Sequence, residues 1–110
     1  MASEQNYLNS RRLQLHSDLV NLLGTDNVYF QPPSNINIKY PCIIYGLDNI
    51  EATKADNAVY SRTVKYRLTY VDAKPTSIMV DNLSKLSPKI KFIRHYVVDN
   101  LNHYVFTIYY

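Results

Sequence analysis

The side chains that most often bind metals or act as nucleophiles are scarce in this sequence. The three histidines are His16, His95 and His103. They show no spacing typical of a metal site among themselves, with a carboxylate or with the single cysteine, Cys42. A closing hairpin would bring His95 and His103 near each other, but strand histidines far more often stack or hydrogen-bond than bind metal. The sequence therefore predicts no metal site.

The patterns that activate a nucleophile or hold a phosphate are not visible either. Cys42 stands among isoleucine and tyrosine residues, an apolar setting that keeps a thiol protonated and unreactive. The two glycines, Gly24 and Gly46, do not form a glycine-rich phosphate loop. No pattern suggests paired-carboxylate chemistry. We therefore expect a protein that is not an enzyme and that uses no cofactor.

The composition is that of one modest globular domain. Of 110 residues, 46% are hydrophobic and 19% are charged. The net charge is +3, but the basic residues are spread from Arg11 to Arg94 without a run, which disfavours a dedicated nucleic-acid binder. Residues 1–6 lack the regions of a signal peptide, and no apolar run reaches the roughly 20 residues of a membrane helix. We expect a cytosolic chain without an intrachain disulfide.

The clearest element is a strand over Arg62–Val71, where apolar and polar residues alternate. One face of this strand would carry Val64, Tyr66, Leu68 and Tyr70, and the other Thr63, Lys65, Arg67 and Thr69. Further strands are expected at Asn27–Phe30, Cys42–Leu47, Lys89–Val98 and His103–Tyr110. A turn at Asp99–Asn102 joins the last two strands, because Asn and Asp tolerate left-handed backbone.

Two helices complete the expected fold. Leucines at helical spacing predict a helix over Ser3–Leu23 that ends at Gly24. Thr76 or Ser77 caps a second, short helix whose inward residues are Met79, Val80, Leu83 and Leu86. The order is then α-β-β-β-α-β-β. We expect a single α+β domain over residues 1–110, with an antiparallel or mixed sheet and helices packed mainly on one face.

Two segments suggest contacts with other molecules. Asp48–Ser61 is polar and long for a hairpin loop, so it is either a solvated connection or an arm that reaches a neighbour. The chain ends on an aromatic, apolar run that needs a partner surface, in its own domain or in a neighbouring subunit. The candidate protein-interface residues are Glu51, Lys54, Asp56, Asn57, Tyr60, Tyr109 and Tyr110.

Three segments taken together carry a resemblance to a known family. They are Tyr40–Tyr45, Ala55–Pro75 and Arg94–Phe106. In order and spacing they resemble the small tail-completion proteins of long-tailed bacteriophages, such as siphoviruses, and particularly the tail terminators. The likeness spans roughly Leu15 to Tyr110, and its motifs are structural rather than catalytic.

This resemblance implies a structural virion protein. Family members form a homohexameric ring that caps the head-proximal end of the tail tube and presents a surface to the head connector or stopper. The implied partners are further copies of the chain, the tail tube protein and the connector, with the genome passing through the ring and no sequence-specific DNA contact. The protein would be made in the host cytoplasm and reside in the virion tail. The alternatives are a head-side connector of the same virion class and a small nucleic-acid-binding module.

Overall fold

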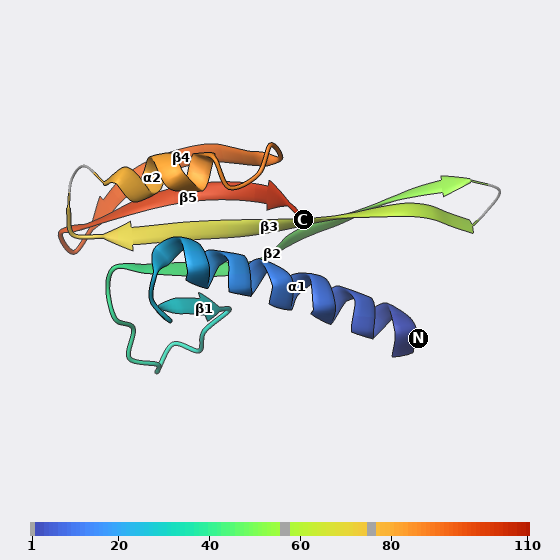
Figure 1. Cartoon of the computed structure of the whole chain (residues 1–110), viewed down its shortest axis with the longest axis horizontal. Coiled ribbons are helices and arrows are strands. Elements are labelled where there is room, and N and C mark those ends of the chain that lie inside the picture. Colours follow the sequence, from blue (N-terminus) through green and yellow to red (C-terminus); the bar gives the residue numbers. More distant parts are fainter. Residues whose placement is uncertain (1, 56–57, 75–76) are drawn as a thin grey trace.

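The fold is a five-stranded mixed sheet with two helices (Figure 1). The computed structural model describes residues 2–55, 58–74 and 77–110, with side chains described at 9–52, 62–74 and 77–110. The elements are α1 (Ala2–Leu23), β1 (Val28–Phe30), β2 (Cys42–Ala55), β3 (Ala58–Asp72), α2 (Ile78–Ser84), β4 (Ile90–Val98) and β5 (Leu101–Tyr109). The α+β class and the order α-β-β-β-α-β-β are therefore as the sequence predicts.

The sheet is built around β3, in the strand order β1-β2-β3-β5-β4. The short β1 runs parallel to β2, while all other neighbours are antiparallel. β3 pairs with β2 along most of its length and with β5 from Lys65 to Asp72. Its predicted alternation is confirmed, since Val64, Tyr66, Leu68 and Tyr70 are all buried.

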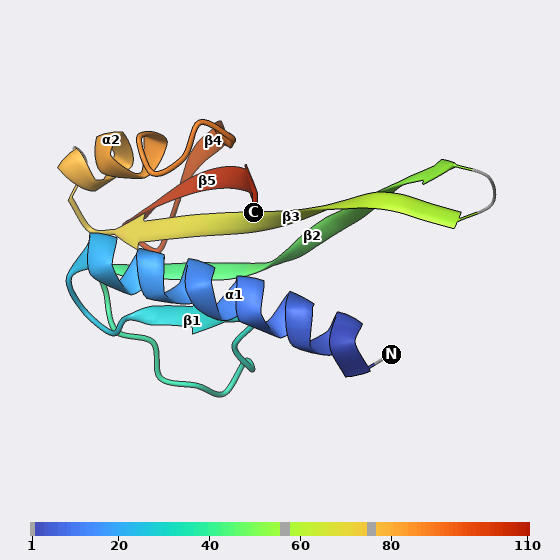
Figure 2. The ribbon, with the colours of Figure 1, turned by 45° about the vertical axis from the view of Figure 1, so that its right-hand side comes forward.

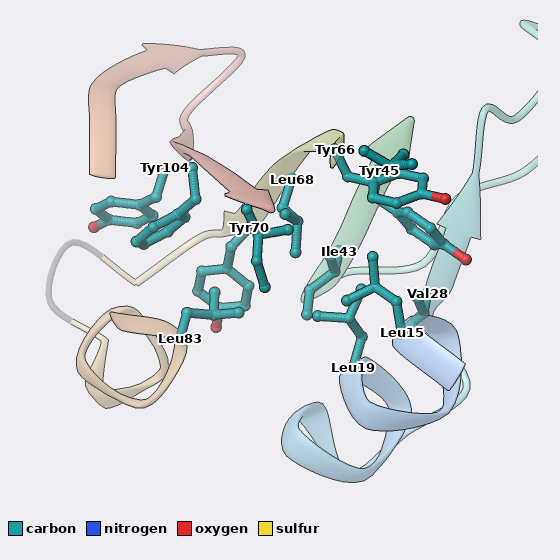
Figure 3. Close-up of a cluster of buried hydrophobic side chains, with 13 residues drawn as sticks. Leu15, Leu19, Val28, Ile43, Tyr45, Tyr66, Leu68, Tyr70, Leu83 and Tyr104 are labelled. Atoms are coloured by element: carbon teal, nitrogen blue, oxygen red, sulfur yellow. The ribbon is translucent and has the colours of Figure 1, made fainter. Parts of the chain in front are cut away.

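The core lies between this face of the sheet and the two helices (Figure 3). Each helix contributes buried leucines to it, two from α1 and one from α2. Half-buried apolar side chains around the cluster include Leu22, Leu23, Met79, Val80 and Leu86, so the inward face predicted for α2 is confirmed. The buried residues of this cluster are Leu15, Leu19, Val28, Ile43, Tyr45, Val64, Tyr66, Leu68, Tyr70, Leu83, Tyr104, Phe106 and Ile108.

The helix ends follow the local rules that the sequence indicates. After α1, Gly24 adopts a positive φ of 82° and its N–H donates to the Val20 carbonyl at 2.8 Å. Glycine adopts this left-handed backbone without a Cβ clash, so it ends the helix. At the start of α2, Ser77 is the N-cap and its Oγ accepts from the Met79 N–H at 3.2 Å. Thr76, the other predicted cap, lies outside the described residues.

A buried polar group ties the end of β3 to α2. The Tyr70 hydroxyl donates to Asp72 Oδ2 at 2.6 Å and lies 3.2 Å from Ser77 Oγ. The other Asp72 carboxylate oxygen accepts from the Lys74 N–H. Burial works to raise the pKa of Asp72, but these hydrogen bonds outweigh it and hold the pKa below its ordinary value. Burial and the Asp72 bond raise the pKa of Tyr70 to about 12, so this phenol stays protonated at neutral pH.

The β4–β5 hairpin closes more tightly than expected. Val98 pairs directly with Leu101, which leaves a two-residue turn of Asp99 and Asn100, both with positive φ. Such turns match the twist of the flanking strands. The predicted turn at Asp99–Asn102 is thus two residues too long, because Leu101 and Asn102 already belong to β5.

The expectation of a loop over Asp48–Ser61 is wrong. β2 continues to Ala55 and β3 begins at Ala58, and the two strands stay paired up to Ala55 and Ala58. Alternation of apolar and polar residues is the sequence signal for a strand, and it requires one buried face. This part of the hairpin extends past the core, so its residues carry no such alternation.

The core assignment predicts a large difference between two leucines of α1. Replacing the fully buried Leu19 by Ala should lower the free energy of unfolding by about 2–5 kcal/mol, because the substitution leaves a cavity. The control is Leu13→Ala at a side chain that is 56% exposed, with an expected change within about 0.5 kcal/mol. Urea denaturation measures both. Equal effects would contradict this packing of α1.

The Tyr70–Asp72 bond predicts a pH-dependent effect of Tyr70→Phe. The pKa of Asp72 is lower in the folded protein than in the unfolded chain. The hydrogen bond therefore adds to the free energy of unfolding at pH values above the Asp72 pKa of the unfolded chain. This contribution is lost as the pH falls through the Asp72 pKa of the folded protein. The variant should therefore be less stable at neutral pH and approach the parent between about pH 5 and pH 2 in urea titrations. Tyr29→Phe is the control, since the Tyr29 hydroxyl accepts a hydrogen bond from the Lys39 backbone N–H, which does not titrate. A stability difference independent of pH would count against the assignment.

Candidate interaction surface

The most prominent feature outside the core is a two-stranded arm, made of Ile50–Ala55 of β2 and Ala58–Val64 of β3. It begins where β5 stops pairing with β3, and it projects well beyond the rest of the sheet (Figures 1 and 2). The chain measures 51 Å along its longest axis and 26 and 23 Å along the others. Two strands without a third are only marginally stable in water, so the arm gains most from a partner.

Five of the predicted interface residues belong to this hairpin. Glu51 is exposed and stands opposite Thr63 on the neighbouring strand. Lys54 lies in β2 opposite Val59, and Tyr60 lies in β3, but only their backbones are described. Asp56 and Asn57 lie outside the described residues. The structure thus brings Glu51, Lys54 and Tyr60 together in one projecting ribbon, and their contact with a neighbour stays a prediction.

The two other predicted residues lie at the base of the arm, and both are engaged within their own chain. Tyr109 pairs with Lys65 of β3, and its N–H donates to the Lys89 carbonyl. The Tyr110 hydroxyl donates to Asp18 Oδ2 at 2.6 Å, and its N–H donates to the Val64 carbonyl. Arg11 donates to the Tyr110 main-chain oxygen and lies 5.0 Å from the ring centroid. Burial and the Asp18 bond raise the pKa of Tyr110 to about 12. Tyr110 therefore joins α1 to the sheet, while Tyr109 is half-buried.

A polar pocket of about 460 Å³ lies beside this junction. Basic side chains from three parts of the chain line it: Arg11 from α1, Arg62 from the arm and Lys89 from the segment before β4.

At the arm base, Asp48 forms ion pairs with Lys65 at 3.5 Å and Arg67 at 3.1 Å. These pairs are partly exposed, so they contribute little stability. Positive charge is thus concentrated around the foot of the arm.

β4 is an apolar edge strand that sequence reasoning did not single out as an interface. Within the described residues it pairs only with β5, and all of its residues after Ile90 are exposed. Its large apolar side chains are 36–58% exposed, and they are Phe92, Ile93, Tyr96, Val97 and Val98. A long apolar edge strand with unpaired backbone groups readily binds another strand. The sequence pattern that could have indicated this surface is the presence of apolar residues on both faces of the strand.

A second exposed apolar region lies at the other side of the sheet. β1 ends at Phe30, so among the described residues no strand pairs with the outer edge of β2 from Gly46 onward. A groove of about 240 Å³ opens there between α1 and β2. We call it the notch, and its lining residues are Asn9, Arg12, Phe30, Gln31, Leu47, Ile50, Val64 and Tyr66. Leu47 and Ile50 are both exposed in it.

The titratable groups singled out in the sequence have structural contacts. His95 Nε2 lies 2.9 Å from Asn102 Oδ1 and its ring stacks on Tyr104. His103 stacks on Tyr96 across the hairpin. The two histidines thus lie on opposite faces, because directly opposed strand residues share a face. Burial raises the pKa of Cys42 to about 11.

No cluster of metal-ligating side chains is found among the described residues. His16 Nδ1 lies 2.7 Å from the Tyr45 hydroxyl, and burial together with the nearby charge of Arg12 lowers its pKa. None of the helices, as far as the structure describes them, combines the length and apolar character needed to cross a bilayer. The prominent features of the described residues outside the core are the arm, the polar pocket, the notch and the exposed edge of β4.

No protein-family model matches the chain, and no curated protein matches it. The surfaces described above and the resemblance of the three sequence segments are therefore the observations that bear on function.

The Tyr110 contacts predict a measurable contribution to stability. Tyr110→Phe removes the hydrogen bond to Asp18 and keeps the ring beneath Arg11, so the free energy of unfolding should fall by about 1 kcal/mol. The matched control is Tyr40→Phe at an exposed tyrosine, where no change is expected. Thermal and urea unfolding report both variants. If Tyr110→Phe behaved like the control, the Asp18 bond would not contribute to the fold.

Proposed function

We propose that this protein is a structural virion component of the tail-terminator type, whose copies assemble head-to-tail into a ring. The observation that carries the proposal is that one small domain has two different unpartnered surfaces. The arm and the notch lie on the β2 side of the sheet, and the apolar β4 is the opposite edge. Exposed apolar surfaces of this kind mark sites of interaction with other molecules.

Two different surfaces favour ring formation on physical grounds. When one patch binds a different patch on the next copy, the contact is heterologous, and a suitable rotation closes the assembly into a ring. The alternative, in which two β4 strands pair with each other, brings together strands that carry Lys91 and Arg94 and no acidic residue. Like charges disfavour that arrangement.

The specific role comes from the resemblance to phage tail terminators. The ring would cap the tail tube at its head-proximal end and present a surface to the head connector or stopper. It would be made in the host cytoplasm and remain in the virion, with the genome passing through it. Six copies are the number that the resemblance implies.

Negative-stain images of the purified protein, with and without tail tubes, test this function. We expect a six-fold ring at one end of each tube. Rings that bind the portal complex and leave tubes uncapped would instead identify a head-side connector. Binding to DNA that weakens steeply with salt, without binding to tubes, would identify a nucleic-acid module.

Shortening the arm is expected to impair assembly without unfolding the domain. Ala52 and Arg62 face each other in the ladder, so an Asn-Gly turn in place of residues 53–61 closes the hairpin there. The core residues are untouched, and the urea midpoint should stay near that of the parent. The control is a glycine inserted between Ser34 and Asn35 in the exposed connection before β2. Unchanged ring formation and tube capping by the short-arm variant would overturn this role of the arm.

A further inference from the structure

We propose that β4 of one copy docks in the notch of the next copy and adds a strand to the outer edge of β2. This inference deepens the proposed function, on whose head-to-tail association it rests, by assigning the two surfaces that meet. The occupant of the notch is thus a second copy of this chain. Three independent properties of the two surfaces lead to this pairing.

The first property is the backbone. β2 loses its neighbour where β1 ends at Phe30, while β4 presents nine residues whose outer edge pairs with no described strand. Polar side chains satisfy two donors of the β2 edge: the Leu47 N–H donates to Gln31 Oε1 and the Ile50 N–H to Asn49 Oδ1. Because these two N–H groups already have partners, an arbitrary strand gains little by pairing with this edge. A strand whose side chains fit the notch would displace the Gln31 and Asn49 oxygens.

The second property is the exposed apolar area. Leu47 and Ile50 project into the notch beside Phe30, and β4 presents Phe92 and Ile93 on an exposed strand. Burial of these groups against each other removes apolar surface from water on both copies. A groove of about 240 Å³ provides a concave site for such side chains.

The third property is charge. Beyond Tyr45, β2 carries two acidic residues, Asp48 and Glu51, and one basic residue, Lys54, whereas β4 carries Lys91 and Arg94 and no acidic residue. Asp48 is already paired with Lys65 and Arg67, which leaves Glu51 as the exposed acid. β3 carries Arg62 and Lys65 in the same region, so β2 rather than β3 is the strand that matches β4. Opposite charges on neighbouring strands stabilise the pair.

Engineered cysteines test the contact directly. Ile50→Cys places a thiol at the notch and Ile93→Cys places one on β4, and the native Cys42 is fully buried and does not compete. The full-length variants are mixed and treated with a short bismaleimide, alone and in the presence of tail tubes. We expect a covalent dimer from the mixture and none from either variant by itself. A chain with both substitutions should give a ladder of higher oligomers.

The controls separate this contact from random collision and from other geometries. Ile78→Cys, at a side chain that is 77% exposed on α2, should give no dimer with Ile50→Cys. Dimers from Ile93→Cys alone would show that β4 pairs with itself and would overturn the inference. Absence of the mixed dimer both with and without tubes would overturn it as well. Urea denaturation of each variant verifies that it is folded.

The outcomes for this contact and for the proposed function are distinguishable. Rings that cap tubes but give no mixed dimer would leave the terminator function standing and reject the β4–notch contact. A mixed dimer from assemblies that do not bind tail tubes would support the contact and reject the terminator function.

Discussion

The structure depends on the one buried face of β3. Val64, Tyr66, Leu68 and Tyr70 all point to the same side of the sheet, so both helices must lie on that side to cover them. Because β3 is the middle strand, its burial also determines which face of β2 and β5 is apolar. Cys42, Val71 and Val105, which alternate with the residues of this face, are also buried, whereas the notch and the outer edge of β4 are left to solvent or to another molecule.

This single-layer coverage explains why the exposed surfaces lie where they do. α1 runs beneath the body of the sheet and the base of the arm, but neither helix reaches the far end of the arm, and both leave the outer side of β4 uncovered (Figures 1 and 2). β1 shields only three residues of β2. The same shortage of covering elements therefore produces the arm, the notch and the apolar edge together. In a ring, neighbouring copies would supply the covering that one chain lacks.

The body of the fold could be predicted from sequence because each of its elements has a local cause. The alternation of Arg62–Val71, the leucine spacing before Gly24 and the serine cap of α2 all act within a few residues. The arm could not be predicted as strand, since its sequence lacks the alternation of apolar and polar residues that marks a half-buried strand. The exposure of β4 could not be predicted for a different reason. Large apolar residues such as Phe92 and Val97 are usually buried, and only the strand order reveals that they lie at an edge.

Tyr110 links parts of the chain that are far apart in sequence. Arg11 and Asp18 lie two helical turns apart on α1, and both bond to this one residue next to β5. Undocking the middle of α1 therefore breaks both contacts of Tyr110 at the same time, while the ladders to β3 and β4 still hold β5. We expect α1 and the segment after β5 to open to solvent together, and the arm, which makes neither contact, to open alone. A partner that binds the arm would thus order it without altering the unit that holds the core.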